Sequence, residues 1–439
     1  MENLNSKKIF VFWMPLAVTW LMMAVEGPLL AAVIARLAAP KYNLAAYGVA
    51  YAIAVFMEAP IIMLMSASTA LVHDRFNYFK LRNFAYRLNF AVTLIMALFL
   101  FPAVFYPVTI NVIGLPGEVA RLTHKACLLL LAWPAAIGYR RFYQGILIRS
   151  NLTRRVAYGT AVRLSVMALT AILLYKFGRL DGVLVGATAL TLGVTAEAVA
   201  SRIMAHRAVS ALLERSEHDS GDEKLDNRRI YSFYYPLALM SMLGLGIQPM
   251  VTFFLGKSPM ALISLAALPV INSLVFIFRS LGLSFQEVGI ALLGRKWEGF
   301  KPLRRFTLVL GMCTAGGLIL VAFTPLSGIW FHKVSGLTLD LARFSVLPTQ
   351  ILALIPGLMV LLSFQRAIFV HARKTKPITI ATAVEVASII LFLVLNIHLI
   401  HVPGAVAAAA ALITGRFLAN VYLFLKLKAG NIIPTEAVN

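Results

Sequence analysis

The sequence predicts an all-α integral membrane protein with twelve transmembrane helices in two pseudo-symmetric six-helix lobes. Three observations predict this fold class. The chain is 60% hydrophobic and 13% charged, with a mean hydropathy of +0.84, whereas a soluble protein is about half apolar and a quarter charged. Apolar runs long enough to cross a hydrocarbon core of about 30 Å recur along the whole chain. Finally, the first half of the sequence is repeated in the second half.

The twelve expected spans cover residues 9–36, 44–72, 84–110, 124–148, 153–176, 182–207, 230–255, 261–292, 304–331, 344–370, 377–398 and 403–426. The first span is too long for a secretory signal peptide and lacks an early small-residue cleavage site, so we expect an uncleaved helix. The two cysteines, Cys127 and Cys313, fall in or beside spans and form no CxxC motif. The sequence therefore predicts no disulfide framework, no metal site and no cofactor.

The distribution of basic residues predicts the topology. A net charge of +22 is compatible with a nucleic-acid partner. However, 25 of the 40 Lys and Arg residues fall in or beside the loops on the side of the N-terminus, nine fall on the other side, and six lie within spans. This is the positive-inside bias. It excludes a nucleic-acid partner and predicts that both termini are cytoplasmic, in a bacterial inner membrane.

An internal duplication explains why a hexapeptide recurs. FWMPLA at 12–17 returns as FYYPLA at 233–238, an offset of 221, and TAVR at 160–163 returns as TAVE at 382–385, an offset of 222. We therefore predict an N-terminal lobe at 1–213, a cytoplasmic linker at 214–229 and a C-terminal lobe at 230–439. Because six spans return the chain to its starting side, the two lobes have the same orientation and are expected to enclose a central cavity.

The residues of this repeat resemble a known superfamily of transporters. The duplicated six-helix plan with a proline-broken first helix resembles the multidrug, oligosaccharidyl-lipid and polysaccharide (MOP) exporter superfamily, which includes the MATE transporters. FWMPLA, EGP at 26–28, LAAYGVAY at 44–51, FYYPLAL at 233–239 and GAVAAAAALITG at 404–415 are most similar to its progressive ankylosis (Ank) family. The resemblance implies a monomeric V-shaped transporter, and animal members are associated with export of small phosphorylated and carboxylate anions.

Eleven ionisable residues lie inside the expected spans, where each is a functional-site hypothesis because a charge there is costly. Arginine suits phosphate and carboxylate groups, and a glutamine amide can donate to a substrate. The expected substrate-binding residues are therefore Arg163, Arg279, Arg366, Gln144 and Gln365. Interhelical hydrogen bonding is an equally open interpretation of the two glutamines, and Arg366, like Arg140 and Arg141, lies where it could instead reach the interface. Arg163 and Glu385 are equivalent in the repeat, and burial of each charge within its own lobe is an equally open interpretation. The expected coupling residues, for protons or sodium, are Glu26 beside Pro28, Glu58 and Glu385. MATE drug exporters commonly carry an aspartate in the first helix, and this chain has Glu26 instead. Glu197 and Arg416 are interpreted as structural.

Three function classes remain open from the sequence. The first is an alternating-access secondary transporter that exports a small organic or phosphorylated anion. The second is a flippase for a lipid-linked saccharide or another phosphate-bearing lipid. The third and least favoured is a membrane enzyme, since every segment outside the spans is short and no HExxH or GxSxG motif is present. Trp13, Trp133, Trp297 and Trp330 lie near span ends or in loops and are interpreted as interfacial anchors.

Overall fold

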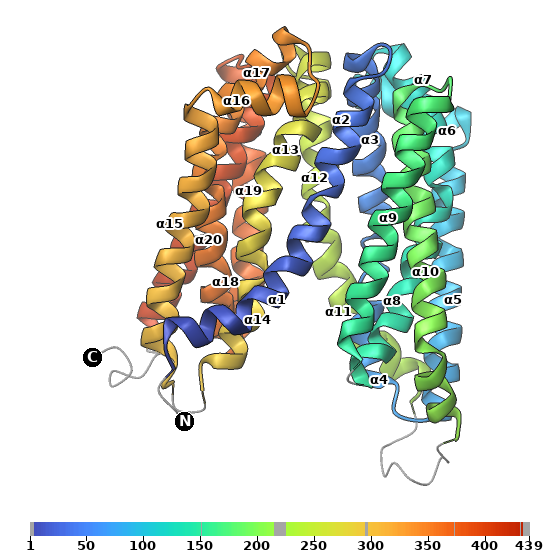
Figure 1. Cartoon of the computed structure of the whole chain (residues 1–439), viewed down its shortest axis with the longest axis vertical. Helices are drawn as coiled ribbons and strands as arrows, with labels where there is room; N and C mark the ends of the chain where they lie inside the picture. Colours follow the sequence, from blue (N-terminus) through green and yellow to red (C-terminus); the bar gives the residue numbers. More distant parts are fainter. Residues whose placement is uncertain are drawn as a thin grey trace. The chain divides into compact units, whose positions relative to one another are not determined.

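The computed structural model describes residues 4–150, 152–214, 225–294, 297–372, 374–430 and 432, and this part of the chain is all-helical (Figure 1). The α-helices are α1 (Ser6–Ala24), α2 (Glu26–Ala35), α3 (Pro40–Glu58), α4 (Leu64–Leu71), α5 (Arg75–Phe99), α6 (Pro102–Tyr106), α7 (Gly117–Leu129), α8 (Trp133–Arg149), α9 (Thr153–Phe177), α10 (Gly182–Glu214), α11 (Asn227–Leu245), α12 (Ile247–Gly256), α13 (Ala261–Leu283), α14 (Phe285–Leu292), α15 (Phe300–Phe323), α16 (Leu326–Gly328), α17 (Leu339–Ile351), α18 (Ile355–His371), α19 (Lys376–Val394) and α20 (Gly404–Ala429). Short π-helical or 3-10 segments adjoin them: η1 (Pro107–Val112), η2 (Leu130–Ala132), η3 (Ile329–Val334), η4 (Leu352–Leu354) and η5 (Leu395–Leu399).

The chain divides into two compact units. Unit 1 comprises Met1–Arg36 and Phe254–Asn439, and unit 2 comprises Leu37–Phe253. The first helix of each sequence repeat therefore packs with helices of the other repeat. Within unit 1, the Trp13 indole of α1 donates to Ser284 Oγ at 2.7 Å. Within unit 2, the Tyr234 hydroxyl of α11 donates to the Pro60 carbonyl at 2.5 Å. These units describe packing, whereas the division at 1–213 and 230–439 describes the duplicated sequence.

The sequence repeat is also a repeat of backbone irregularities. The α7–η2–α8 series and the α17–η4–α18 series begin and end at a constant offset of 222, and η1 and η3 share that offset. Left-handed residues recur in the same way: Ala39 (φ 48°) corresponds to Met260 (φ 56°), and Gly114 (φ 85°) corresponds to Gly336 (φ 73°). Because even strained turns are repeated, the two halves share one backbone plan.

Proline breaks the first helix of each half at an equivalent place. Pro28 has no N–H to donate to the carbonyl of Ala24, and α1 ends at Ala24. In the second half, Pro249 stands in the same relation to Leu245, where α11 ends. A proline inside a helix removes this hydrogen bond and clashes with the carbonyl four residues earlier. The positions of Pro28 and Pro249 in the sequence therefore predict where the two helices break.

The expected count of twelve spans is higher than the number of helices that qualify by length and hydropathy. Among the described residues nine qualify, or ten if the pair Arg75–Phe99 and Pro102–Val112, bent by 70°, is one span. The expected spans 44–72 and 124–148 do not qualify. The first is interrupted between α3 and α4, and the second carries the charged pair Arg140 and Arg141. Several apolar helices nevertheless show a multi-pass integral membrane protein.

The interpretation of two tryptophans as interfacial anchors is wrong. Trp13 is buried in the core of unit 1, where it packs edge-on against Phe306 at a centroid distance of 5.9 Å. Trp133 is buried in unit 2, and its indole N–H donates to a carboxylate. Since a buried indole needs a hydrogen-bond acceptor, both rings are internal structural donors. Their position near span ends could not distinguish burial from an interfacial location.

Candidate functional site

A cluster of buried charges lies between three helices of unit 2. Glu197 of α10 is fully buried and forms ion pairs with Arg140 of α8 and, at 3.4 Å, with Arg163 of α9. The amide nitrogen of Gln144, one turn after Arg140 on α8, donates to the other carboxylate oxygen of Glu197 at 3.1 Å. One glutamate thus holds two guanidinium groups and an amide. The geometry fixes the ends of three long side chains between α8, α9 and α10.

A second carboxylate and a third guanidinium adjoin this cluster. Glu58 at the end of α3 is buried and accepts a hydrogen bond from the Trp133 indole at 2.5 Å. Its electrostatic neighbours are the three arginines 140, 141 and 163. Arg141 is half-buried and reaches the sulfur of Met65 at 3.6 Å. We define the Arg140, Arg141, Arg163, Glu58 and Glu197 side chains as the arginine cluster.

The arginine cluster has an excess of positive charge. It contains three guanidinium groups, which stay protonated in proteins, and two carboxylates. With both carboxylates ionised its formal charge is therefore +1, in a region where uncompensated charge is strongly unfavourable. Such a cluster attracts an anion, because one bound negative charge would neutralise it. It repels a cation for the same reason.

Unit 1 has a smaller polar group at its corresponding helices. Arg416 of α20 pairs with the buried Glu385 of α19 at 2.9 Å. Arg366 of α18 is half-buried and donates to Thr382 Oγ1 at 3.4 Å. The Gln365 amide donates to the backbone carbonyl of Asn420 at 3.2 Å. Arg366 therefore contacts α19, the helix that carries Glu385, whereas Gln365 contacts the backbone of α20.

The remaining predicted residues lie elsewhere in unit 1. Arg279 of α13 is half-buried, with its guanidinium carbon 5.2 Å from the centre of the Phe276 ring. Glu26 is the first residue of α2, directly after the break at Val25, and is half-buried. Within the described residues, no three His, Cys, Asp or Glu side chains are grouped so that they could hold a metal ion.

Repeat-equivalent positions carry opposite charges. Glu58 corresponds to Arg279 at the offset of 221, and Arg163 corresponds to Glu385 at the offset of 222. Because α8 and α18 begin and end at a constant offset of 222, Gln144 corresponds to Arg366. The expected correspondence of Gln144 with Gln365 is therefore displaced by one residue. At these two pairs of positions the duplication has kept a charge and reversed its sign, whereas Arg140 and Glu197 correspond to the uncharged Leu362 and Ala419.

Sequence reasoning identified only part of this site. It selected Arg163, Gln144 and Glu58, which the structure brings together. It missed Glu197, which was interpreted as structural, and Arg140, which was not selected as a binding residue. The available signal was the spacing of Arg140 and Gln144, four residues apart and so on one face of a helix. Arg416 of unit 1 was likewise interpreted as structural, and the structure pairs it with Glu385.

Comparison with solved structures identifies the fold. The chain is similar to an inward-facing multidrug resistance MATE family transporter of the MOP superfamily (TM-score 0.70, 14% identity, 96% of this chain and 99% of that chain). It is also similar to the lipid II flippase MurJ in an inward closed conformation (TM-score 0.71, 14% identity, 97% and 91%). A third similar structure is a MOP superfamily transporter from Pyrococcus furiosus, described as having a binding pocket of reverse polarity (TM-score 0.66, 14% identity, 99% and 98%). No protein-family model matches the chain, and no curated protein sequence matches it. At these identities the similarity shows the MATE/MOP fold.

Proposed function

We propose that this protein is a secondary transporter that exports a small organic or phosphorylated anion by alternating access. The observation that carries the proposal is the arginine cluster, which has three guanidinium groups and two carboxylates inside the membrane helices of unit 2. The MATE/MOP fold supports transport as the general activity, since the similar structures are transporters and a flippase. The binding pocket of the Pyrococcus furiosus transporter is described as having reverse polarity, which supports the idea that pocket charge differs between proteins of this fold.

The proposed chemistry is an exchange of partners at the arginines. A substrate carboxylate or phosphate oxygen replaces Glu197 as the ion-pair partner of Arg163, whose planar guanidinium suits such groups. Glu197 remains paired with Arg140. Gln144 supplies a neutral donor beside it. Arg279, Arg366 and Gln365 are the other residues that we propose to bind substrate. The net charge of the cluster falls from +1 to 0 when one negative charge binds, which favours binding of anions over cations.

Coupling to an ion gradient is part of the proposal. Glu26, Glu58 and Glu385 are the carboxylates proposed to carry a proton or hold sodium. Glu26 is the strongest candidate because it begins α2 at the break of the first helix, where a change of charge can act on the angle of the break. We further propose that the protein acts as a monomer with both termini in the cytoplasm. The finer resemblance to the Ank family agrees with a small anionic substrate.

A flippase for a lipid-linked saccharide or another phosphate-bearing lipid is the second candidate. The similarity to MurJ favours it, and the same arginines would then hold a phosphate or diphosphate group. The two candidates differ in whether the substrate needs an apolar tail. This difference gives a direct test.

The test measures the thermal stability of purified protein with citrate, nucleotides, pyrophosphate, polyprenyl diphosphate and the cation ethidium. A small-anion exporter is stabilised by one of the soluble anions, and this stabilisation is lost in Arg163→Gln. Stabilisation by polyprenyl diphosphate and by none of the soluble anions would favour the flippase and contradict the exporter. Tight binding of ethidium would contradict both proposals, because the arginine cluster repels cations.

A further inference from the structure

The turn between α3 and α4 leaves two backbone carbonyls to be satisfied by side chains. Pro60 has no N–H, and the Phe56 carbonyl accepts the Ala59 N–H instead, at 3.2 Å. The Glu58 carbonyl accepts the first two N–H groups that follow Pro60. Within the described part of the chain, no backbone N–H donates to the carbonyl of Ala59 or of Pro60. Because a carbonyl that is removed from water needs a donor, this turn depends on a neighbouring helix.

Two hydroxyl groups of α11 supply the donors. The Tyr234 hydroxyl donates to the Pro60 carbonyl at 2.5 Å. The Ser241 hydroxyl donates to the Ala59 carbonyl, also at 2.5 Å. Both side chains are buried, and they lie about two turns apart on one face of α11. The two carbonyls belong to the residues directly after Glu58, so α11 holds the backbone at the point where it leaves the arginine cluster.

An equivalent contact recurs in unit 1. Trp13 of α1 corresponds to Tyr234 at the offset of 221. Leu281 corresponds to Pro60 at the same offset. The Trp13 indole donates to Ser284 Oγ at 2.7 Å, and Ser284 Oγ donates to the Leu281 carbonyl at 2.7 Å. The carbonyl that Tyr234 reaches directly is therefore reached by Trp13 through a serine. Since different side chains reach the same carbonyl of the repeat, the contact belongs to the shared backbone plan.

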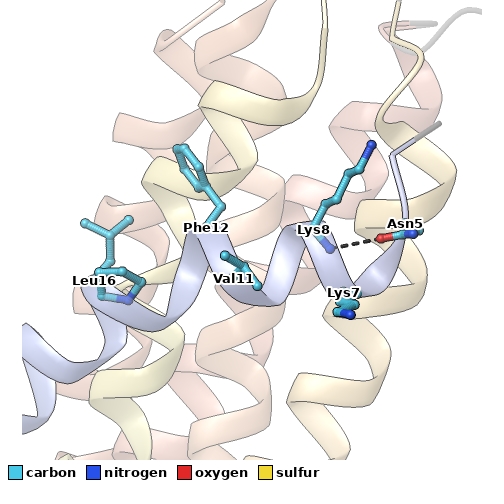
Figure 2. A pocket seen from close by; sticks show the side chains of 7 residues that line it. Asn5, Lys7, Lys8, Val11, Phe12 and Leu16 are labelled. Carbon is cyan, nitrogen blue, oxygen red and sulfur yellow. Dashed lines mark hydrogen bonds between the residues drawn. The ribbon is translucent and has the colours of Figure 1, made fainter. Parts of the chain in front are cut away.

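Both donors lie on the buried faces of their helices. In α1, Trp13 is buried, whereas Val11 and Phe12 are exposed and line an open pocket beside the helix (Figure 2). In α11, Tyr234 is buried, whereas its neighbour Tyr235 is exposed. Tyr235 therefore supplies a matched control, because its substitution by phenylalanine removes the same hydroxyl from the same helix. Tyr234 is a sharper target than Ser241, which also lies 2.9 Å from a carbonyl of its own helix.

We propose that Tyr234 is a positioning residue for Glu58 and that α11 thereby sets the charge of the arginine cluster. While α11 holds the turn, the Glu58 carboxylate lies among the three arginines and accepts the Trp133 indole. When the bond from Tyr234 is lost, the turn moves and withdraws the carboxylate. The formal charge that the cluster presents to an anion then rises from +1 toward +2.

This mechanism lets α11 change the affinity for an anion without touching it. α11 ends at the helix break that Pro249 causes, so its angle can change as the transporter changes conformation. The effect on anion binding rests on the proposed function. The positioning of Glu58 by Tyr234 does not, and it is tested separately.

Fluorine NMR of protein labelled with 5-fluorotryptophan tests the positioning without a ligand. The Trp133 resonance reports the contact with Glu58 and is assigned by its absence in Trp133→Phe. We expect Tyr234→Phe to shift this resonance in the same direction as Glu58→Gln, and Tyr235→Phe to leave it unchanged. The resonance of Trp330, in unit 1, should keep its position in all three variants, which shows that the fold is intact.

A double-mutant cycle with inorganic pyrophosphate tests the consequence for anion binding. We expect isothermal titration to show about tenfold tighter binding in Glu58→Gln, because a nearby negative charge is removed. Tyr234→Phe should tighten binding about threefold, in keeping with the loss of one hydrogen bond. In the Glu58→Gln background Tyr234→Phe should have no further effect, since no carboxylate is left to be positioned. A purely structural Tyr234 would instead weaken binding or stability equally in both backgrounds.

An unchanged Trp133 resonance in Tyr234→Phe would overturn the proposal, and so would an equal shift in Tyr235→Phe. Weaker pyrophosphate binding in Tyr234→Phe, or the same change in both backgrounds, would also contradict it. If the parent protein binds neither pyrophosphate nor any other anion of the thermal screen, the proposed function fails. The Trp133 resonance still decides in that case whether Tyr234 positions Glu58.

Discussion

Glu197 is the residue on which the buried charge of unit 2 depends. It is the ion-pair partner of both Arg140 and Arg163 and accepts a hydrogen bond from Gln144. We expect Glu197→Gln to destabilise the protein by about 3–5 kcal/mol, because removing one partner of a buried pair leaves uncompensated charge. Thermal unfolding in detergent measures the effect. The matched control is Glu118→Gln in the exposed pair with Arg121, where we expect no measurable change.

Arg279 tests whether a sequence-predicted arginine binds substrate. If it contacts the anion, Arg279→Ala lowers the binding free energy by about 1.5–3 kcal/mol, the range for a hydrogen bond to a charged group. Isothermal titration with the ligand identified in the thermal screen measures this loss. A purely structural Arg279 behaves differently, since the variant would lose thermal stability while the folded protein keeps its affinity. Measuring both quantities on one preparation distinguishes the two roles.

Glu26 tests the coupling proposal at the start of α2. We expect Glu26→Gln to slow gradient-driven transport, because glutamine keeps the shape and hydrogen bonding of the side chain but cannot carry a proton or hold a cation. Uptake into proteoliposomes under imposed pH or sodium gradients measures the effect, and Glu287→Gln on the exposed face of α14 is the control. A variant with the pH and sodium dependence of the parent would exclude Glu26 as the coupling site.

At the scale of elements, close helix contacts follow the repeat but do not always keep the same residue. Within unit 2, a Cβ on Gly138 of α8 would overlap Ile61, and in unit 1 the equivalent contact joins Val360 of α18 to Gly282 of α13. Ile61 lies in the turn between α3 and α4, so the glycine has moved to the other side of the contact. A close crossing needs a small residue on one side only. Sequence alone predicts the crossing from the repeat, but it cannot predict which helix supplies the glycine.

One crossing retains its glycine in both halves, beside the charged residues. A Cβ on Gly193 would lie 3.0 Å from the Arg163 carbonyl oxygen, and a Cβ on Gly415 would lie 2.9 Å from the Glu385 carbonyl oxygen. We expect Gly415→Ala to destabilise the protein by about 1–3 kcal/mol through overpacking. The control is Gly316→Ala on α15, where a Cβ meets nothing within 4 Å. Equal thermal unfolding of both variants would show that the crossing can relax.

At the scale of the whole molecule, the all-helical membrane fold was predictable because composition and span length constrain it strongly. The broken first helices were predictable from Pro28 and Pro249. The assignment of α1 and α11 to opposite units was not, since a local hydropathy pattern contains no information about which distant helix is a neighbour. For the same reason the partner of Arg163 was missed. Glu197 lies 34 residues later on the next helix, and its role depends on packing rather than on local sequence.

The predicted topology concerns the whole chain and places both termini and the 214–229 linker in the cytoplasm. Most of that linker lies outside the described residues, so labelling provides the test. In a background with Cys127 and Cys313 replaced by serine, we expect a cysteine at Ser220 to be protected from a membrane-impermeant maleimide added to intact cells.

A cysteine at Thr338 is the positive control for this labelling. Thr338 is exposed and precedes α17 in a loop expected on the opposite side of the membrane, so it should react in intact cells. Because the positive-inside bias depends on many basic residues in short loops, the whole orientation must hold or reverse together. Labelling at 220 with protection at 338 would therefore reverse the entire topology.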